Sequence, residues 1–192
     1  MSAKILVLAG SIRDGSLNIK LANALTKAIN SLGADATHIS LSDYDLPLFN
    51  AEIDVPDNAI ALAKQFAQSD GLVLVSPEYN ASVTPLMKNT LDWVSVTSSN
   101  SGNSYGPYKD KICFIASCSP GSTGGLRGLY HLRAILMNVG AEIITPQLSV
   151  GDGRKAYDDD GSLKDPRMVS LMDKGLDELL FTIKRIKAVP RS

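Results

Sequence analysis

The 192-residue sequence contains only two cysteines and two histidines. Cys113 and Cys118 fall in one predicted strand, about 16 Å apart, which no disulfide can bridge. The sequence has no Cys-x-x-Cys pair, and His38 and His131 are isolated from each other. Zinc ribbons and cysteine-ligated iron–sulfur clusters are therefore disfavoured. We expect no metal site, and we interpret both histidines as surface or packing residues.

Long hydrophobic runs are also missing. The apolar run that ends at Gly10 is too short for the core of a signal peptide followed by a cleavage site, and no other stretch approaches the length that spans a bilayer. The formal net charge of −1 gives no electrostatic reason to expect nucleic acid or an anionic membrane as a partner. These absences favour cytoplasmic residence.

Alternating apolar strands and amphipathic helices dominate what is present. Hydrophobic residues make up 44% of the chain and charged residues 20%, as in an ordinary soluble domain. Apolar runs predict strands over 5–9, 36–41, 71–76, 111–118 and 141–148. Patterns of helical period predict helices over 17–33, 57–69, 85–95 and 167–187, and a further helix that begins after Gly125.

This alternation predicts a parallel sheet covered by helices on both faces. Five strands favour a flavodoxin-like, three-layer α/β/α sandwich of strand order 2-1-3-4-5 over a six-stranded dinucleotide-binding fold. The sequence has no linker or internal repeat, so we expect one domain over residues 1–192. In this strand order the chain reverses direction between strands 1 and 3, and a cleft is expected at their carboxyl ends.

The loop Gly10–Asn18 lies at that cleft, between the first strand and the first helix. Backbone N–H groups at a helix N-terminus, hydroxyl groups and a guanidinium suit a phosphate. The candidate ligands in this loop are Ser11, Arg13, Ser16, Leu17 and Asn18. Alternatively, Ser16 only caps the helix and Arg13 is only solvated.

Two nucleotide motifs fail in this loop. Gly10 and Gly15 have the spacing of a triphosphate-binding P-loop, but Ser16 and Leu17 replace the lysine and hydroxyl residue that should follow. Ile12 occupies the position of the second glycine of a dinucleotide fingerprint. The loop is therefore predicted to hold one terminal phosphate.

Two further loops border the same cleft. The segment after the third strand carries two stiffening prolines and offers accessible N–H groups, which suits a flat, hydrogen-bonding ring such as a flavin. The segment after the fourth strand is rich in glycine and permits close approach of a ligand. A rigid turn that packs against another subunit is the alternative for the first of these loops. The candidate residues are Pro77, Glu78, Tyr79, Asn80, Ser82, Ser117, Ser119, Gly121 and Gly124.

These motifs together resemble the NAD(P)H-dependent FMN reductase family, which includes quinone, chromate and azo-dye reductases. The resemblance rests on Gly10-Ser11-x-Arg13-x-x-Ser16-x-Asn18, on Pro77-Glu78-Tyr79-Asn80-x-Ser82-x-x-Pro85, and on Gly124-Gly125. It extends from the first strand to the last helix. Two departures are Gly128, where alanine is expected, and a longer, more polar loop over residues 96–110.

The resemblance implies an FMN whose phosphate is held by Ser11, Arg13, Ser16 and Asn18 and whose ring lies along residues 77–80. It also implies NAD(P)H as co-substrate, a quinone, free flavin or similar small acceptor, ping-pong turnover, and a homodimer or homotetramer. Because FMN carries the chemistry, no catalytic side chain is expected. The alternatives are a flavodoxin-like electron carrier and a flavin-binding sensor that do not turn over nicotinamide. The low net charge and Arg13 disfavour the carrier.

Overall fold

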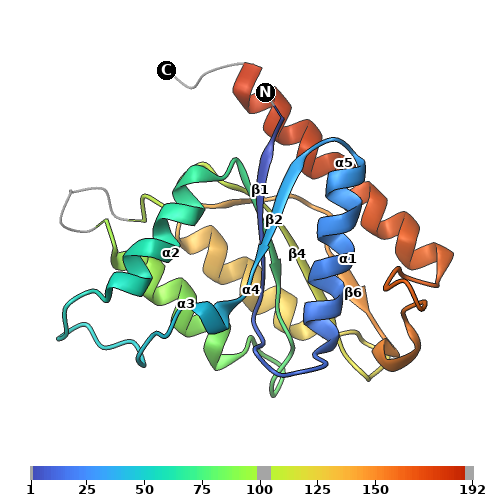
Figure 1. The fold of residues 1–192 in the computed structure, drawn as a ribbon, viewed down its shortest axis with the longest axis horizontal. Helices are drawn as coiled ribbons and strands as arrows, with labels where there is room; N and C mark the ends of the chain where they lie inside the picture. Colours follow the sequence, from blue (N-terminus) through green and yellow to red (C-terminus); the bar gives the residue numbers. More distant parts are fainter. Residues whose placement is uncertain (1, 99–104, 189–192) are drawn as a thin grey trace.

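A computed structural model describes residues 2–98 and 105–188 of the chain. A parallel sheet is flanked by helices on both faces, and strands alternate with helices along the chain (Figure 1). The strands are β1 (Lys4–Ala9), β2 (Asp35–Ile39), β3 (Gly71–Val75), β4 (Ile112–Cys118), β5 (Glu142–Ile143) and β6 (Leu148–Val150). The α-helices are α1 (Leu17–Ser31), α2 (Asp57–Gln68), α3 (Pro85–Val96), α4 (Leu126–Asn138) and α5 (Pro166–Ala188), and the 3₁₀ turns are η1 (Leu41–Asp43) and η3 (Gly153–Lys155).

The strand order confirms the predicted topology. The sheet runs β2-β1-β3-β4-β5, and every pairing in it is parallel. The neighbours β1 and β3 pair from Ile5 opposite Gly71 to Ala9 opposite Val75. Their carboxyl ends therefore lie level at one edge of the sheet, where the chain order reverses.

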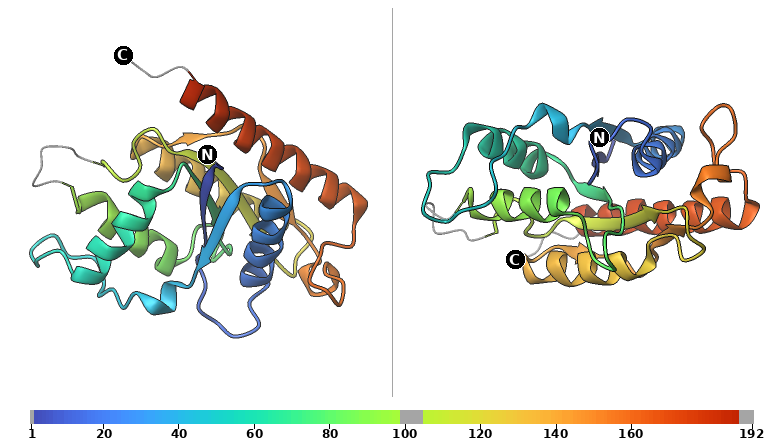
Figure 2. Two further views of the ribbon diagram at one scale, coloured as in Figure 1. Left: turned by 45° about the horizontal axis from the view of Figure 1, so that its top comes forward. Right: turned by 90° about the horizontal axis from the view of Figure 1, so that it is seen from below.

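Alternate residues of the central strands pack against different helices. Val7 and Val73 face the layer formed by α1 and α5, whereas Leu8 and Leu72 face the layer formed by α2, α3 and α4. In Figure 2, α1 and α4 lie on opposite sides of the sheet. Because both faces are covered, the strands are apolar throughout, which is the pattern that made them predictable.

The predicted fifth strand over residues 141–148 is wrong as one strand. Ile112 of β4 lies opposite Glu142, but Ala116 lies opposite Leu148, so four steps along β4 correspond to six steps along its partner. The two extra residues bulge out between β5 and β6. Pro146 lies in this interval and has no N–H group to donate to a ladder.

Arg133 of α4 compensates for the lost ladder. Its guanidinium donates to the carbonyl oxygens of Ile144 at 3.1 Å and Thr145 at 3.4 Å, and to the side chain of Gln147 at 3.1 Å. A carbonyl group without a partner in a half-buried position is unfavourable. The guanidinium therefore stabilises the break between β5 and β6.

Asp70 joins three elements at the amino-terminal edge of the sheet. Its carboxylate accepts from the backbone N–H of Lys4 at 2.7 Å and lies 2.7 Å from Lys187 Nζ. Burial alone would raise the pKa of Asp70, but the bonds from Lys187 and Lys4 outweigh burial and lower the pKa below its ordinary value.

Asp70 is predicted to stabilise the fold above about pH 4, and this contribution disappears as the pH falls through the lowered pKa. We expect Asp70→Asn to decrease the free energy of unfolding by about 1–2 kcal/mol at pH 7 and by much less at pH 2. Urea titrations at the two pH values measure both differences. An equal loss at both pH values would contradict the assignment.

Candidate functional site

Three loops gather beyond the carboxyl ends of β1, β3 and β4, at the lower edge of the molecule in Figure 1. They span residues 10–16, 76–84 and 119–125. The first two are joined by Thr84, whose Oγ1 donates to the carbonyl oxygen of Gly10 at 2.8 Å and accepts from the N–H of Met87 at 3.1 Å. Thr84 is thus the N-cap of α3. A Cβ on Gly10 would lie 2.9 Å from Thr84 Oγ1, so this contact requires glycine at position 10.

The loop after β1 presents backbone donors and Arg13. Arg13 is exposed, and its guanidinium bonds only weakly, at 3.3 Å, to the carbonyl oxygen of Asp14. Within the described ranges, the N–H groups of Ile12, Asp14 and Gly15 donate to no acceptor in the chain. These groups and the half-buried Ser11 can serve an anion.

The remaining predicted phosphate ligands already have protein partners. Ser16 is the buried N-cap of α1, and its Oγ accepts from the N–H of Asn18 at 3.3 Å. Leu17 begins α1, and its carbonyl oxygen accepts from the Tyr157 hydroxyl at 3.0 Å. Ser16 therefore caps α1, and its hydroxyl retains one proton to donate.

The Asn18 side chain pairs with a peptide 100 residues away. Its amide nitrogen donates to the carbonyl oxygen of Cys118 at 2.8 Å, and its oxygen accepts from the N–H of Cys118 at 2.9 Å. Both residues are buried. These two hydrogen bonds tether the start of α1 to the end of β4. Asn18 thereby helps to hold the loop over residues 10–16 in position.

The loop after β3 contains a strained two-residue hairpin. The N–H of Tyr79 donates to the carbonyl oxygen of Ser82 at 2.9 Å, and the reverse bond is 3.0 Å. The central residues have φ values of 49° at Asn80 and 65° at Ala81. Type I′ turns need positive φ at both positions, which glycine and asparagine tolerate and alanine does not. Backbone strain of this kind often marks functional sites.

Glu78 connects this hairpin to α4. Its side chain is only 7% exposed, and its Oε2 accepts from the N–H groups of Arg127 at 3.0 Å and Gly128 at 3.2 Å, while Oε1 accepts from the Arg127 guanidinium. Burial alone would raise the pKa of Glu78, but the bonds from Arg127 and Gly128 outweigh it and lower the pKa. The carboxylate is therefore ionised and fully occupied by protein donors.

The departure at Gly128 now has a physical explanation. A Cβ there would lie 3.1 Å from the carbonyl oxygen of Ser82 and 3.4 Å from Glu78 Cβ. The absence of a side chain lets α4 approach the hairpin closely. The other departure, the loop over residues 96–110, lies partly outside the described residues.

Ser117 and Gly125 meet at the end of β4. The Ser117 hydroxyl is fully buried and has no hydrogen-bond partner among the described residues. Gly125 has φ +89°, and a Cβ there would overlap the Ser117 hydroxyl. In the same loop, the Ser119 hydroxyl donates to the carbonyl oxygen of Gly121 at 3.3 Å. Gly124, with φ +63°, packs against the backbone of Val150. A buried hydroxyl without a hydrogen-bond partner, such as that of Ser117, is energetically unfavourable, so we expect it to bond a further group.

Trp93 belongs to the packing of the chain itself. The side chain is 1% exposed, donates to the carbonyl oxygen of Pro47 at 2.7 Å and contacts the ring of Phe49 edge-on.

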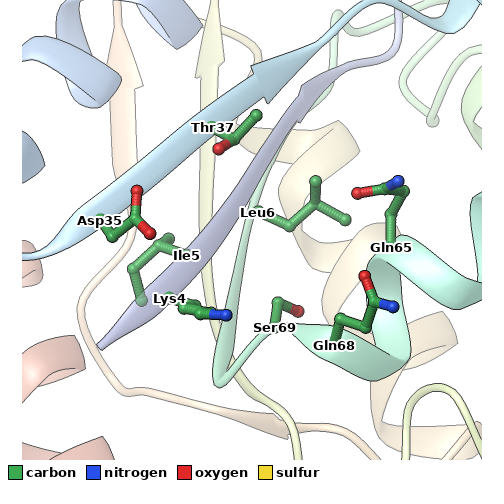
Figure 3. A pocket seen from close by; sticks show the side chains of 8 residues that line it. All are labelled: Lys4, Ile5, Leu6, Asp35, Thr37, Gln65, Gln68 and Ser69. Carbon is green, nitrogen blue, oxygen red and sulfur yellow. The ribbon is translucent and has the colours of Figure 1, made fainter. Parts of the chain in front are cut away.

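A separate hollow of about 190 Å³ lies at the opposite edge of the sheet. Figure 3 shows its lining, which includes Lys4, Asp35 and Ser69 at the amino ends of β1, β2 and β3. Ligands of open parallel sheets bind outside the carboxyl ends instead.

Among the described residues, no group of three His, Cys, Asp or Glu side chains could hold a metal, and no helix is long and apolar enough to cross a membrane.

Comparison with known proteins decides the family. The family model described as NADPH-dependent FMN reductase matches residues 3–155, which include all three loops. The chain belongs to this family. Of its similar relatives, a quinone reductase of Escherichia coli K12 is 37% identical over 146 residues, covering 73% of each chain. An NAD(P)H-dependent FMN reductase of Pseudomonas aeruginosa is 29% identical and covers 96% of this chain and 97% of its own.

Two solved structures show the same fold. FerB, a flavoenzyme NAD(P)H:(acceptor) oxidoreductase from Paracoccus denitrificans, superposes with a TM-score of 0.82 at 26% identity, covering 95% of this chain and 98% of its own. RosB superposes with a TM-score of 0.79 at 12% identity, covering 99% of this chain and 82% of its own. At this low identity the similarity shows a shared fold and no more. The flavodoxin-like architecture is therefore confirmed.

The strain at Ala81 can be measured. We expect Ala81→Gly to increase the free energy of unfolding by about 1 kcal/mol, because glycine adopts positive φ without a Cβ clash and Asn-Gly is a favoured type I′ pair. Ala61→Gly, on the exposed face of α2, is the matched control and should lose about 1 kcal/mol. If both variants lose stability equally in urea titrations, position 81 carries no strain.

Proposed function

We propose that this family member is an FMN-dependent oxidoreductase that takes a hydride from NAD(P)H and reduces a quinone, free flavin or similar small acceptor. For a quinone, NAD(P)H, a proton and the quinone give NAD(P)⁺ and the hydroquinone. The family match over the three loops at the switch point carries this proposal. Its family and its relatives favour an enzyme over the electron-carrier and sensor alternatives.

The residues at the switch point fit an FMN. The loop after β1 offers free N–H groups, the Ser11 hydroxyl and the exposed Arg13 guanidinium, a donor set suited to a phosphate. The hairpin after β3 offers the N–H groups of Asn80 and Ala81, which have no acceptor in the described part of the chain. The orphaned Ser117 hydroxyl supplies a further polar group at the end of β4.

Bound FMN would supply hydride acceptance and electron donation, while the chain supplies orientation and electrostatics. Ser11, Arg13 and the backbone of residues 12–15 would hold the phosphate. Ser16, Leu17 and Asn18 would keep that loop in place, a role that their bonds to the protein support. Pro77, Glu78, Tyr79, Asn80 and Ser82 would form the wall along the ring, with Ser117, Ser119, Gly121 and Gly124 bordering it.

Ping-pong turnover, cytoplasmic residence and assembly into a homodimer or homotetramer belong to the same proposal. The exposed Tyr79, on the hairpin beside the proposed ring, is consistent with a second subunit or a substrate covering it. Sedimentation of the purified protein measures the number of subunits. A monomer at all concentrations would contradict the assembly.

Arg13 provides the sharpest test of the phosphate site. We expect Arg13→Ala to weaken FMN binding roughly 10- to 100-fold, the loss of one charge-assisted pair, with little change in the free energy of unfolding because the side chain is exposed. Lys184→Ala removes the same charge from the exposed surface of α5 and is the control. Flavin fluorescence during titration into apo-protein gives both affinities, and equal affinities would refute the assignment.

Turnover separates a reductase from an electron carrier. The FMN-loaded protein should oxidise NADPH or NADH continuously when a quinone is present, at a rate proportional to enzyme concentration. The absorbance of the nicotinamide at 340 nm reports this consumption. A single stoichiometric oxidation without turnover would favour the carrier.

A further inference from the structure

Glu78 has a role that differs from that of the other residues in its loop. The N–H groups of Asn80 and Ala81 have no acceptor in the described part of the chain. The Glu78 carboxylate, in contrast, lies against α4 and is bonded there by two backbone N–H groups and a guanidinium. Its side chain is nearly buried, and its acceptor sites are occupied. Glu78 therefore has little capacity left to bond a ligand directly.

The start of α4 needs this carboxylate. The N-cap residue of α4 is Gly125, which has no side chain to accept a bond from the first turn. Glu78 supplies that cap from another loop, because it accepts from the second and third residues of the helix, Arg127 and Gly128. The cap locks Glu78 to the helix.

The other end of the hairpin is locked as well. Ser82 Oγ lies 2.9 Å from His131 Nδ1 on α4, and Thr84 donates to the carbonyl oxygen of Gly10. Between these two points the chain crosses Asn80 and Ala81 with positive φ. An alanine in this conformation persists only where its surroundings impose it. The bonds of Glu78 and Ser82 to one helix are the constraint that imposes it.

We propose that Glu78 is a positioning residue, which holds the Asn80–Ala81 turn in its strained conformation so that the backbone donors of the turn are preformed for the flavin ring. This inference rests on the proposed function, because the donors matter only if a ring binds there. Two backbone N–H groups of α4 and the Arg127 guanidinium together supply the constraint on the nearly buried Glu78 carboxylate.

A double-mutant cycle with Ala81→Gly tests this role. In Glu78→Ala the turn is expected to relax, so that only a fraction of the molecules keeps the binding conformation. The apparent FMN affinity is then reduced to that fraction of its wild-type value. We expect a loss of about five- to tenfold, the magnitude of one left-handed alanine. Ala81→Gly removes the strain, so Glu78→Ala/Ala81→Gly should recover at least half of the loss on a logarithmic scale. The effect of Glu78→Ala is measured once against the wild type and once against Ala81→Gly, and it should be smaller in the second background.

Amide hydrogen exchange in the FMN-free protein gives a readout that is independent of the ligand. The N–H groups of Tyr79 and Ser82, which close the hairpin, should exchange faster in Glu78→Ala than in the wild type and slow again in the double variant. If Glu78→Ala does not fold, Glu78→Gln takes its place, because glutamine retains an acceptor for α4. We then expect a smaller loss of FMN affinity, which Ala81→Gly should again restore. Asp92→Ala removes a carboxylate from the Lys88–Asp92 pair on α3 and should leave FMN affinity within twofold.

Two results would overturn the inference. One is an affinity unchanged in Glu78→Ala, and the other is a loss that Ala81→Gly does not restore, which would mean that Glu78 acts on the ligand itself. Failure of the proposed function is distinct, because the wild-type protein would then bind no FMN while the exchange rates of Tyr79 and Ser82 still responded to Glu78.

Discussion

The candidate site depends on hydrogen bonds that tie three loops together where the sheet ends. Parallel strands pair along their length, but beyond Ala9, Val75 and Cys118 the ladder stops and each loop must be held in another way. Asn18 ties the start of α1 to the end of β4, Thr84 joins the first loop to the second, and Glu78 joins the second to α4. Loops held at both ends lose little conformational entropy when a ligand binds, which is the benefit of a preformed site.

Glycine makes these ties possible. Thr84 can reach its partner because position 10 has no Cβ, and the hairpin can lie against α4 because position 128 has none. The Ser117 hydroxyl occupies the space where a side chain of residue 125 would stand. Gly10 and Gly125, which belong to the family pattern, and Gly128, which departs from it, are thus points of close contact around the three loops.

The sequence predicts the layers and the strand order, since apolar strands and amphipathic helices follow directly from burial on both faces of the sheet. It also offers a cap role for Ser16, as the alternative to a phosphate ligand, because capping is local chemistry. It does not predict the break near Pro146, since the apolar run continues through it and the compensating Arg133 lies on another element. Nor does it predict that Asn18 pairs with Cys118, because that contact spans 100 residues.

The same distinction applies to the site. The residue types in the first loop indicate a phosphate, but only the structure separates Arg13, which is free to bind, from Asn18, which is already bonded. Glu78 has no local signal for its role, because its partners on α4 are about 50 residues away. Ala81 carries no turn signal at all, and its positive φ follows from the packing around it. Local sequence is enough to propose the chemistry of the site, whereas the proposed division between binding and positioning residues depends on contacts that are distant in sequence.

Amide hydrogen exchange of the whole protein with and without FMN tests the location of the site most directly. The account predicts that FMN slows exchange in residues 10–18, 76–84 and 117–125 together, and leaves the amino-terminal edge around Lys4, Asp35 and Ser69 unchanged. Protection at that edge, or flavin binding without protection of the three loops, would contradict it.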